Sequence, residues 1–385
     1  MGSERGQGSV EKNCNRTGAR CEWRSCHLLV HYAVTGLNRK AGSLEPAFFF
    51  CGRVFSGDMK AVIITRPGGP EVLEIQERPK PEPGVGQIRV RVHASALNRA
   101  DLMQREGNYP VPPGVPADIA GMEYVGEVDA LGDGATLWKV GERVMGIIGG
   151  AGHAEYLCVH EREAMPVPRE TSTEDAAAIP EAFLTAHDAL FKRLDLRMGE
   201  TLLIHATGSG VGTAALQIAK VTGARVIGTA RSADKLARAK QLGLDAAIDS
   251  SRGEWAVEVE KLFGSQSVNA VLDLVGGNYL EGNLRVLALK GRLVVVGLTA
   301  GATAPFNMGV LLRKRLTIVG TMLRARSLEE KIALAREFAE RGVPLFESGQ
   351  LKPIVDRVFS FEEIRAAHEL MHSNATFGKI VLRWA

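Results

Sequence analysis

Cysteine is scarce in this 385-residue chain, and its five copies are unevenly placed. Only Cys158 lies beyond residue 58, and the other four are Cys14, Cys21, Cys26 and Cys51. A single cysteine excludes a disulfide framework for residues 59–385 and is typical of a protein kept in a reducing compartment. We therefore expect a cytoplasmic protein.

Long apolar runs and an excess of charge of one sign are also missing. The longest apolar runs, such as residues 293–298, have the length of a β-strand and fall far short of the ~20 residues that span a bilayer. Residues 1–58 carry eight Lys and Arg against five Asp and Glu, which accounts for the whole net charge of +3. The rest of the chain is balanced, so neither a membrane nor a nucleic acid is expected as a partner.

The first 58 residues lack the features of a known leader or metal site. Cys21, Cys26, His27 and His31 have a spacing that fits no common zinc pattern, and no signal-peptide order is found. The segment is rich in Arg, as transit peptides are, but its five acidic residues count against that alternative. Met59 opens a clean strand, so we expect residues 1–58 to be disordered or a spurious extension.

Beyond Met59 the sequence pattern changes near residue 180. Residues 59–180 contain short strands broken by Gly and Pro turns, and residues 87–93 alternate in a way that predicts one buried and one wet face. This pattern is typical of a small antiparallel β barrel or sandwich. From about residue 180 strands alternate with helices, which predicts a parallel sheet, and a further helix over 328–341 precedes the last strands.

A glycine cluster lies inside the alternating part. Gly208, Gly210 and Gly212, with Ser209 and Val211 between them, join a strand over 201–205 to a helix over 213–222, and a second strand follows over 225–230. Glycine lets a phosphate approach the N–H groups at a helix N-terminus, where the helix dipole favours an anion. The strand, cluster, helix and strand together predict a dinucleotide site.

The end of the second strand indicates which dinucleotide binds. NAD enzymes usually place an acidic residue there to hold the ribose 2′-hydroxyl. This sequence instead has Arg231, Ser232 and Lys235, which suit the roughly two negative charges of a 2′-phosphate. Ser232 can also cap a helix over 232–242, and the two roles are compatible. We therefore expect NADPH as the cofactor.

Several motifs spread over residues 59–385 carry a family resemblance together. Besides the glycine cluster, they are residues 96–105 (ALNRADLMQR), 121–126 (GMEYVG), 140–145 (VGERVM), 179–185 (IPEAFLT) and 323–327 (LRARS). This part of the chain resembles the zinc-independent quinone oxidoreductases of the medium-chain dehydrogenase/reductase superfamily, most of all the branch that contains the tumour-suppressor-induced NADPH quinone oxidoreductase. The resemblance implies an α/β protein with a GroES-like β-barrel catalytic domain (59–180 and 320–385) and a Rossmann domain (181–319).

The resemblance also bears on zinc. Zinc-containing members place their three catalytic ligands at positions that correspond here to Asn98, Met122 and Phe183. The four-cysteine structural lobe of those members is absent from this sequence. These side chains do not supply the nitrogen and sulfur ligands that tetrahedral zinc prefers, so we expect no metal. Without a Lewis acid, an electron-poor acceptor such as a quinone or an activated enone is the favoured substrate.

Two polar residues match the substrate cleft of the family. Asn98 is expected to hydrogen-bond a quinone oxygen, and Tyr109 is expected to position the acceptor or donate a proton. Structural roles are equally open: Asn98 can cap the helix that follows it, and Tyr109 can pack in its Pro-rich loop. A second cleft tyrosine of the family is replaced here by Met103, which predicts a more apolar pocket.

Other cofactor contacts are implied by position in the family. Thr185 is expected near the nicotinamide, and Ser250 stands where relatives often have a tyrosine near the 2′-phosphate. The remaining expected contacts lie in two loops, and they are Gly297, Leu298, Phe377, Gly378 and Lys379, the last as a phosphate partner. Residues 291–297 and 306–321 lie where relatives pair into homodimers or dimers of dimers.

Three functions remain open on the sequence. The favoured one is NADPH-dependent reduction of quinones by hydride transfer without zinc. The first alternative is an NADPH-dependent reductase of 2-enoyl thioesters or enones, which shares the fold. The second is a non-catalytic NADPH-binding sensor, since a fold does not guarantee turnover.

Overall fold

A computed structural model describes residues 57–384 of the chain. The expectations for the leader, including its cysteines, histidines and disorder, lie outside the described residues apart from its last two positions. The described part contains a six-stranded sheet, a seven-stranded sheet and a separate two-stranded hairpin. No helix in residues 57–384 is both long enough and apolar enough to cross a membrane.

The six-stranded sheet is entirely parallel and has the strand order β10-β9-β8-β11-β12-β13. Its strands are β8 (Thr201–Ile204), β9 (Arg225–Ala230), β10 (Ala246–Asp249), β11 (Val268–Asp273), β12 (Leu287–Val295) and β13 (Thr317–Gly320). The chain order reverses between β8 and β11, and Rossmann sheets bind nucleotides at the carboxyl ends of strands at such a reversal. The predicted doubly wound α/β sheet is confirmed.

Helices alternate with these strands along the chain, as the pattern predicted. They are α4 (Gly210–Val221), α5 (Ala233–Gln241), α6 (Trp255–Phe263), α7 (Tyr279–Val286) and α8 (Met308–Lys314). Helix α4 begins three residues before the predicted position, because Ser209 is its N-cap and the last two glycines of the cluster form its first turn. The helix predicted over 232–242 is α5, one residue shorter at each end.

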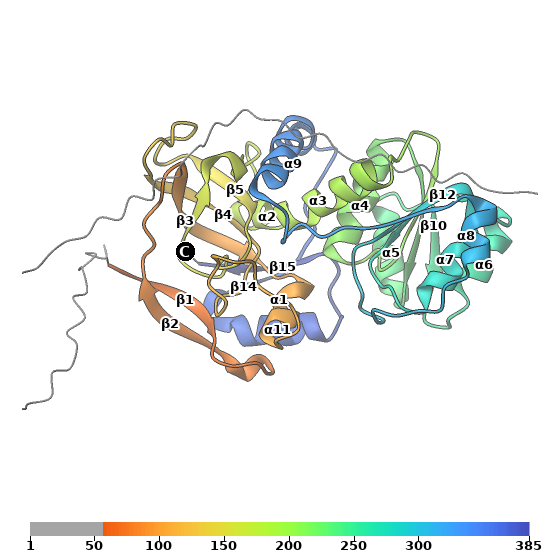
Figure 1. The fold of residues 1–385 in the computed structure, drawn as a ribbon, viewed down its shortest axis with the longest axis horizontal. Helices are drawn as coiled ribbons and strands as arrows, with labels where there is room; N and C mark the ends of the chain where they lie inside the picture. Colours follow the sequence, from red (N-terminus) through yellow and green to blue (C-terminus); the bar gives the residue numbers. More distant parts are fainter. Residues whose placement is uncertain (1–56, 385) are drawn as a thin grey trace, which may run out of the picture. The chain divides into compact units, whose positions relative to one another are not determined.

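The seven-stranded sheet joins distant parts of the chain. It has the order β14-β15-β3-β4-β5-β7, with β6 also paired to β3, and all pairs except β14 with β15 are antiparallel. The strands are β3 (Gln87–Ala96), β4 (Glu123–Leu131), β5 (Arg143–Ile147), β6 (Tyr156–His160), β7 (Met165–Pro166), β14 (Val355–Ser360) and β15 (Lys379–Arg383). Figure 1 shows β15, from the C-terminal end of the chain, beside β3, from its N-terminal part.

Further elements surround the seven-stranded sheet. Strands β1 (Asp58–Ile64) and β2 (Leu73–Pro79) form the hairpin, which Figure 1 shows next to the last helix. The helices are α1 (Arg99–Arg105), α2 (Thr173–Ala177), α3 (Pro180–His187), α9 (Leu328–Arg341), α10 (Val343–Glu347) and α11 (Ile364–His372). Helix α9 has the bounds that the sequence predicted, and its Ser327 cap with Glu330 forms a capping box that fixes its start.

The alternation over residues 87–93 does not give a wet face throughout, so that prediction was wrong in part. Arg89 lies on the face expected to be solvated, yet its side chain is only 11% exposed. It forms salt bridges with Asp129 at 2.6 Å and Glu82 at 3.0 Å. These carboxylates compensate the charge of Arg89, which allows an arginine, usually an exposed residue, to be buried here.

One hydrophobic core runs from the seven-stranded sheet to the six-stranded sheet. It includes Val125 of β4, Phe183 of α3, Leu216 of α4 and Leu272 of β11, each at most 2% exposed. Helix α3 lies in this core against α4 and therefore links the two sheets. The domain boundaries near residues 180 and 320 remain a prediction, because residues 57–384 belong to one compact unit.

Candidate active site

The glycine cluster forms a cradle of close backbone contacts at the start of α4. A Cβ on Gly212 would lie 2.5 Å from the carbonyl oxygen of Ala206, and a Cβ on Gly208 would lie 3.0 Å from Cδ2 of Phe377. None of the three glycines has a positive φ, whereas Ala206 has a φ of 49°. The cluster therefore needs glycine for close approach and not for a left-handed turn.

Ser209 and Val211 complete this first turn. The Ser209 hydroxyl accepts a hydrogen bond from the Gly212 N–H at 3.1 Å and so caps the helix. The first N–H groups of a helix have no partner within the helix, and the helix dipole favours an anion beside them. The cradle and this helix start fit the pyrophosphate of a dinucleotide.

The C-terminal loop lies directly on the glycine cluster. The Gly378 N–H donates to the Gly208 carbonyl at 2.9 Å, and the Phe377 side chain is 2% exposed. Gly378 has a φ of 97°, and a Cβ there would lie 2.2 Å from the Ile354 carbonyl oxygen, so only glycine fits. The structure thus brings together two segments that the sequence separates by about 170 residues, as their expected shared role requires.

The expected 2′-phosphate residues lie at the end of β9 and the start of α5. Arg231 is exposed, and Lys235 is half-buried with its Cδ 3.1 Å from the position of a Cβ on Gly208. Ser232 is the N-cap residue of α5, but its side chain makes no capping hydrogen bond. Ser250 is 8% exposed, and its N–H donates to Ala230 at 3.0 Å, so it lies beside the same strand end.

Asn98, Glu123 and Lys379 form a buried network. The Lys379 ammonium donates to Glu123 Oε1 at 2.7 Å, to Asn98 Oδ1 at 2.6 Å and to the Leu97 carbonyl at 2.8 Å. Asn98 Nδ2 donates to Glu123 Oε1 at 2.8 Å and to the Ala96 carbonyl at 3.3 Å. Lys379 is 4% exposed and Glu123 is fully covered, so the charge of each is compensated by the other.

This network changes the roles expected for two residues. All three hydrogens of the Lys379 ammonium are used, which argues against a contact with a cofactor phosphate; its alkyl chain instead contacts Gly210. Both amide hydrogens of Asn98 are used too, which argues against donation to a quinone oxygen. Asn98 is the N-cap residue of α1, and its N–H donates to Asp101 at 2.7 Å, so the structural alternative has support.

Glu181 is a site residue that the sequence analysis quoted inside a motif without giving it a role. Its N–H donates to Glu123 Oε2 at 2.8 Å, which ties the start of α3 to the network. Burial, followed by the charge of Glu123, raises the pKa of the Glu181 carboxyl to about 8, while Lys379 opposes the shift. The Thr185 hydroxyl, one helical turn later and 5% exposed, hydrogen-bonds this carboxyl. Glu181 is therefore protonated at neutral pH.

Tyr109 lies in the loop after α1, against Arg324. The Arg324 guanidinium is 5.0 Å from the centre of the Tyr109 ring, and it donates to the Gly149 carbonyl at 2.7 Å and to Gln104 at 2.6 Å. Burial, and then the charge of Glu181, raises the pKa of the half-buried Tyr109 phenol. Arg324 belongs to the motif over 323–327, and its role as a support for Tyr109 was not predicted.

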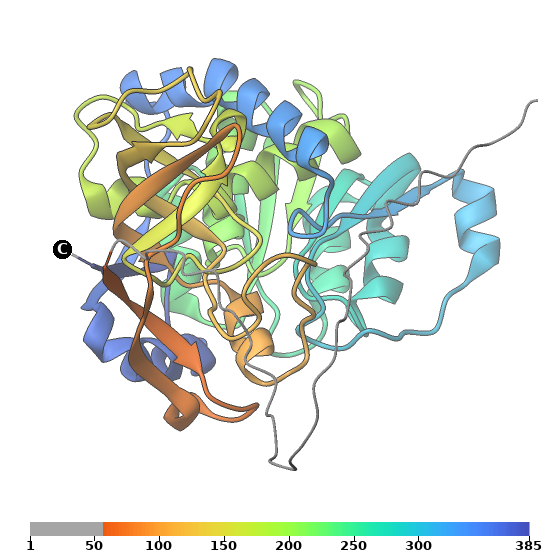
Figure 2. The ribbon, with the colours of Figure 1, turned by 60° about the vertical axis from the view of Figure 1, so that its left-hand side comes forward.

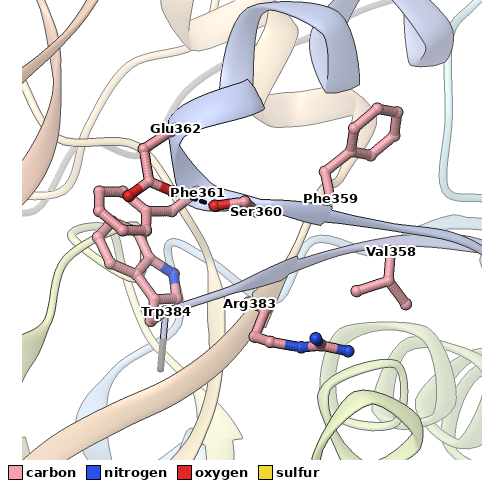
Figure 3. A pocket seen from close by; sticks show the side chains of 7 residues that line it. All are labelled: Val358, Phe359, Ser360, Phe361, Glu362, Arg383 and Trp384. Carbon is pink, nitrogen blue, oxygen red and sulfur yellow. Dashed lines mark hydrogen bonds between the residues drawn. The ribbon is translucent and has the colours of Figure 1, made fainter.

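The remaining expected residues lie after β12. Gly297 packs so closely on the Leu274 carbonyl that a Cβ would lie 2.5 Å from its oxygen, and Leu298 is 52% exposed. Both residues follow the carboxyl end of β12, as the resemblance implied. A surface pocket of about 390 Å³ lies elsewhere, between β14 and the end of β15, and the stacked rings of Phe361 and Trp384 line it (Figure 3). None of the expected site residues lines it.

Comparisons with known proteins agree with this arrangement. Residues 84–169 match the Alcohol dehydrogenase GroES-like domain family, and residues 210–340 match the Zinc-binding dehydrogenase family. A quinone oxidoreductase of Pseudomonas aeruginosa is 35% identical over 82% of this chain and 96% of its own length. The crystal structure of an NAD-dependent alcohol dehydrogenase is 35% identical, with a TM-score of 0.75 over 85% of this chain and 100% of that chain.

A second similar structure is the enoyl reductase CurK, which is 27% identical, with a TM-score of 0.73 over 85% of this chain and 98% of that chain. The two sheets, the glycine cradle and these matches define a pyridine-nucleotide-dependent oxidoreductase. The chain belongs to the quinone oxidoreductases of the medium-chain dehydrogenase/reductase superfamily. The expected GroES-like and Rossmann architecture is confirmed.

Proposed function

We propose that the protein uses NADPH to reduce quinones by hydride transfer and that it does so without zinc. The observation that carries the proposal is the buried Asn98–Glu123–Lys379 network, because it occupies a position where zinc-containing relatives have a ligand and because the Lys379 alkyl chain contacts Gly210 of the cradle. Bound NADPH supplies a hydride, and reduction of a quinone to a hydroquinone needs one further proton. The chain's own residues then have to orient the acceptor and hold that proton.

The case against zinc rests on the residues at the expected ligand positions. Asn98 is engaged by Lys379 and Glu123, and neither Met122 nor Phe183, at 4% and 2% exposure, offers a nitrogen or thiolate ligand. Phe183 instead packs edge-on against Phe346, with ring centres 4.8 Å apart. These side chains do not fit the tetrahedral sites of zinc dehydrogenases.

The case for NADPH rests on the cations at the end of β9. Arg231 and Lys235 stand where an NAD enzyme has an acidic residue, and Lys235 lies over Gly208 of the cradle. An NAD-dependent protein is among the similar structures, so the choice between the two cofactors needs a direct test.

Two groups are candidates to hold the proton. Burial raises the pKa of Glu181 to about 8, so its carboxyl favours the protonated form at neutral pH, beside Thr185. The Tyr109 hydroxyl makes no hydrogen bond within residues 57–384 and so is free to contact an acceptor oxygen. We assign Tyr109 to acceptor contact, Glu181 to proton supply and Asn98 to positioning of Lys379 and Glu123.

The test is a set of parallel assays on the full chain. Loss of reduced-nicotinamide absorbance is followed with NADPH or NADH, using an ortho-quinone or a crotonyl thioester as acceptor. Each assay is repeated after dialysis against a chelator and after adding back zinc. Turnover of the quinone with NADPH, unchanged by chelation, is the expected result.

Other results favour the alternatives. Turnover of the thioester alone makes the protein an enoyl reductase, the activity named for the similar structure CurK. Binding of NADPH without turnover of either acceptor favours the sensor. Loss of activity on chelation with recovery on adding zinc would contradict the zinc-free part alone.

A further inference from the structure

Asn374 joins two cations that come from different helices. Arg99 is the first residue of α1, and its guanidinium donates to Asn374 Oδ1 at 2.5 Å and to the Met371 carbonyl at 3.1 Å. Lys235 of α5 donates from its ammonium to the Asn374 carbonyl at 2.5 Å. Asn374, which has a left-handed φ of 57°, therefore holds both positive charges beside the C-terminal loop.

The charge around Asn374 is not balanced. Burial and then Arg231 lower the pKa of Lys235, and Arg238 and Arg99 add to this effect, with Asp356 alone opposing it. Asp356 is itself engaged, since it pairs with Arg238 at 3.5 Å and accepts from the Phe377 N–H at 3.0 Å.

Three of these cations have no carboxylate of their own. Within residues 57–384, Arg99, Arg231 and Lys235 form no salt bridge with an acidic side chain. Burial is the main cause that lowers the pKa of Arg99; Glu106, which pairs with Arg105, opposes it, and the positive charge of Arg231 adds a smaller lowering. Uncompensated cations held this close together favour an anion among them.

The cluster borders the cofactor cradle. The Lys235 side chain covers Gly208, and the Arg238 guanidinium lies 4.3 Å from the centre of the Phe377 ring, which packs on the same glycine. The carboxyl end of β9 is where the adenine-side ribose of a dinucleotide lies in a Rossmann sheet. The anion that fits is therefore a phosphate on that ribose.

We propose that Arg99 completes the 2′-phosphate site with Arg231 and Lys235, so that a residue outside the Rossmann sheet determines cofactor specificity. The inference rests on the proposed use of NADPH and extends it by one residue that the sequence analysis did not select. A phosphate monoester dianion would neutralise most of the cluster, whereas NADH would leave three cations unpaired. Arg99 directly follows Asn98, so one turn of chain serves both the phosphate and the buried network.

The test measures binding rather than turnover. Dissociation constants of the full chain for NADPH, NADH and 2′,5′-ADP are measured by titration calorimetry for the wild type, Arg99→Gln and Arg99→Lys. Arg99→Gln is expected to weaken the binding of NADPH and of 2′,5′-ADP about tenfold, the equivalent of one charge-assisted contact. The dissociation constant for NADH should change by less than about twofold. Arg99→Lys, which keeps the charge, is expected to lie between the two.

A matched control is Arg336→Gln, an exposed arginine on α9 that forms no salt bridge within the described chain. It should leave all three constants unchanged, and thermal unfolding checks that each variant is folded. If Arg99→Gln weakens the binding of NADPH and NADH equally, or if the variant keeps its selectivity for NADPH, the role of Arg99 is overturned but the proposed cofactor is not. A wild type that binds NADH as tightly as NADPH overturns the proposed cofactor as well.

Discussion

At the scale of single residues, Glu181 carries the sharpest prediction. Its carboxyl has a pKa of about 8, raised chiefly by burial, so it holds a proton at neutral pH and loses it under mildly alkaline conditions. Quinone reduction is expected to decline as the pH rises through this value. Glu181→Gln, which cannot release a proton, is expected to lower kcat about 100-fold at neutral pH and to flatten the profile.

Thr185→Val is the comparison variant, because it removes the hydrogen bond that lowers the Glu181 pKa and should shift the decline to higher pH. The pH dependence of unfolding tests the same carboxyl independently. Its pKa is 4.5 when the side chain is exposed, as in the unfolded chain, so the folded chain binds more protons between pH 4.5 and about pH 8. The free energy of unfolding then falls as pH rises across this range, and it should fall less in Glu181→Gln. A wild-type rate that rises through this range would contradict the assignment.

Tyr109 carries the second residue-scale prediction. Tyr109→Phe keeps the ring on the Arg324 guanidinium but removes the hydroxyl that is free to contact an acceptor. KM for the quinone is expected to rise about tenfold, the size of one lost hydrogen bond to a polar partner, while the dissociation constant for NADPH stays unchanged. Steady-state kinetics and cofactor titration measure the two effects separately. An unchanged KM would show that Tyr109 only packs in its loop.

At the scale of elements, two glycines of the cluster differ in the kind of atom that an added Cβ would meet. A Cβ on Gly212 meets the backbone oxygen of Ala206 at 2.5 Å, whereas a Cβ on Gly210 meets only Cδ of the Lys379 side chain at that distance. Backbone cannot yield without moving β8 away from α4, but a side-chain methylene can rotate. Gly212→Ala is therefore expected to lower the free energy of unfolding by roughly 1–3 kcal/mol, and Gly210→Ala by less than about 1 kcal/mol.

Chemical denaturation of the two variants measures this difference, and their NADPH affinities give a second comparison. Gly210→Ala pushes on Lys379, so it is expected to disturb the buried network more than the fold. Equal stability losses would mean that the loop relaxes as a whole and that the two contacts do not differ in stiffness.

Elements were also where sequence reasoning succeeded most. Strand β9 and helix α9 have their predicted bounds; β9 is a short, mostly buried run between Gly223 and Ser232, the N-cap residue of the next helix, and a capping box marks the start of α9. The buried network was not predicted, since Asn98, Glu123 and Lys379 are joined by contacts across up to 281 positions of chain. The sequence analysis expected Lys379 to contact a cofactor phosphate, and only the fold shows that its ammonium has three partners inside the protein.

At the scale of the whole molecule, one of the hydrophobic clusters in residues 57–384 extends from the seven-stranded sheet to the six-stranded sheet, within a single compact unit. Local patterns show where a strand-rich segment gives way to alternating strands and helices, but they do not show that α3 packs into both sheets. Phe183 belongs to that shared core, where it packs edge-on against Phe346. The two sheets are therefore expected to unfold together in a single transition.

The last prediction concerns assembly, which we expect to use the β13 edge of the six-stranded sheet. Helix α8 has no buried residue, with Met308 and Leu312 at 69% and 77% exposure, and Figure 2 shows it standing away from the neighbouring helices. An edge strand with apolar side chains beside it is suited to pairing with a second copy, since burying one such side chain contributes about 1.5–3 kcal/mol.

Leu312→Glu is expected to weaken a homodimer at least about tenfold in sedimentation experiments. Leu137→Glu, equally apolar before the change and 61% exposed in the loop between β4 and β5, should leave the assembly intact. A wild type that stays monomeric at all concentrations, or a dimer indifferent to Leu312→Glu, would place the interface elsewhere or remove it.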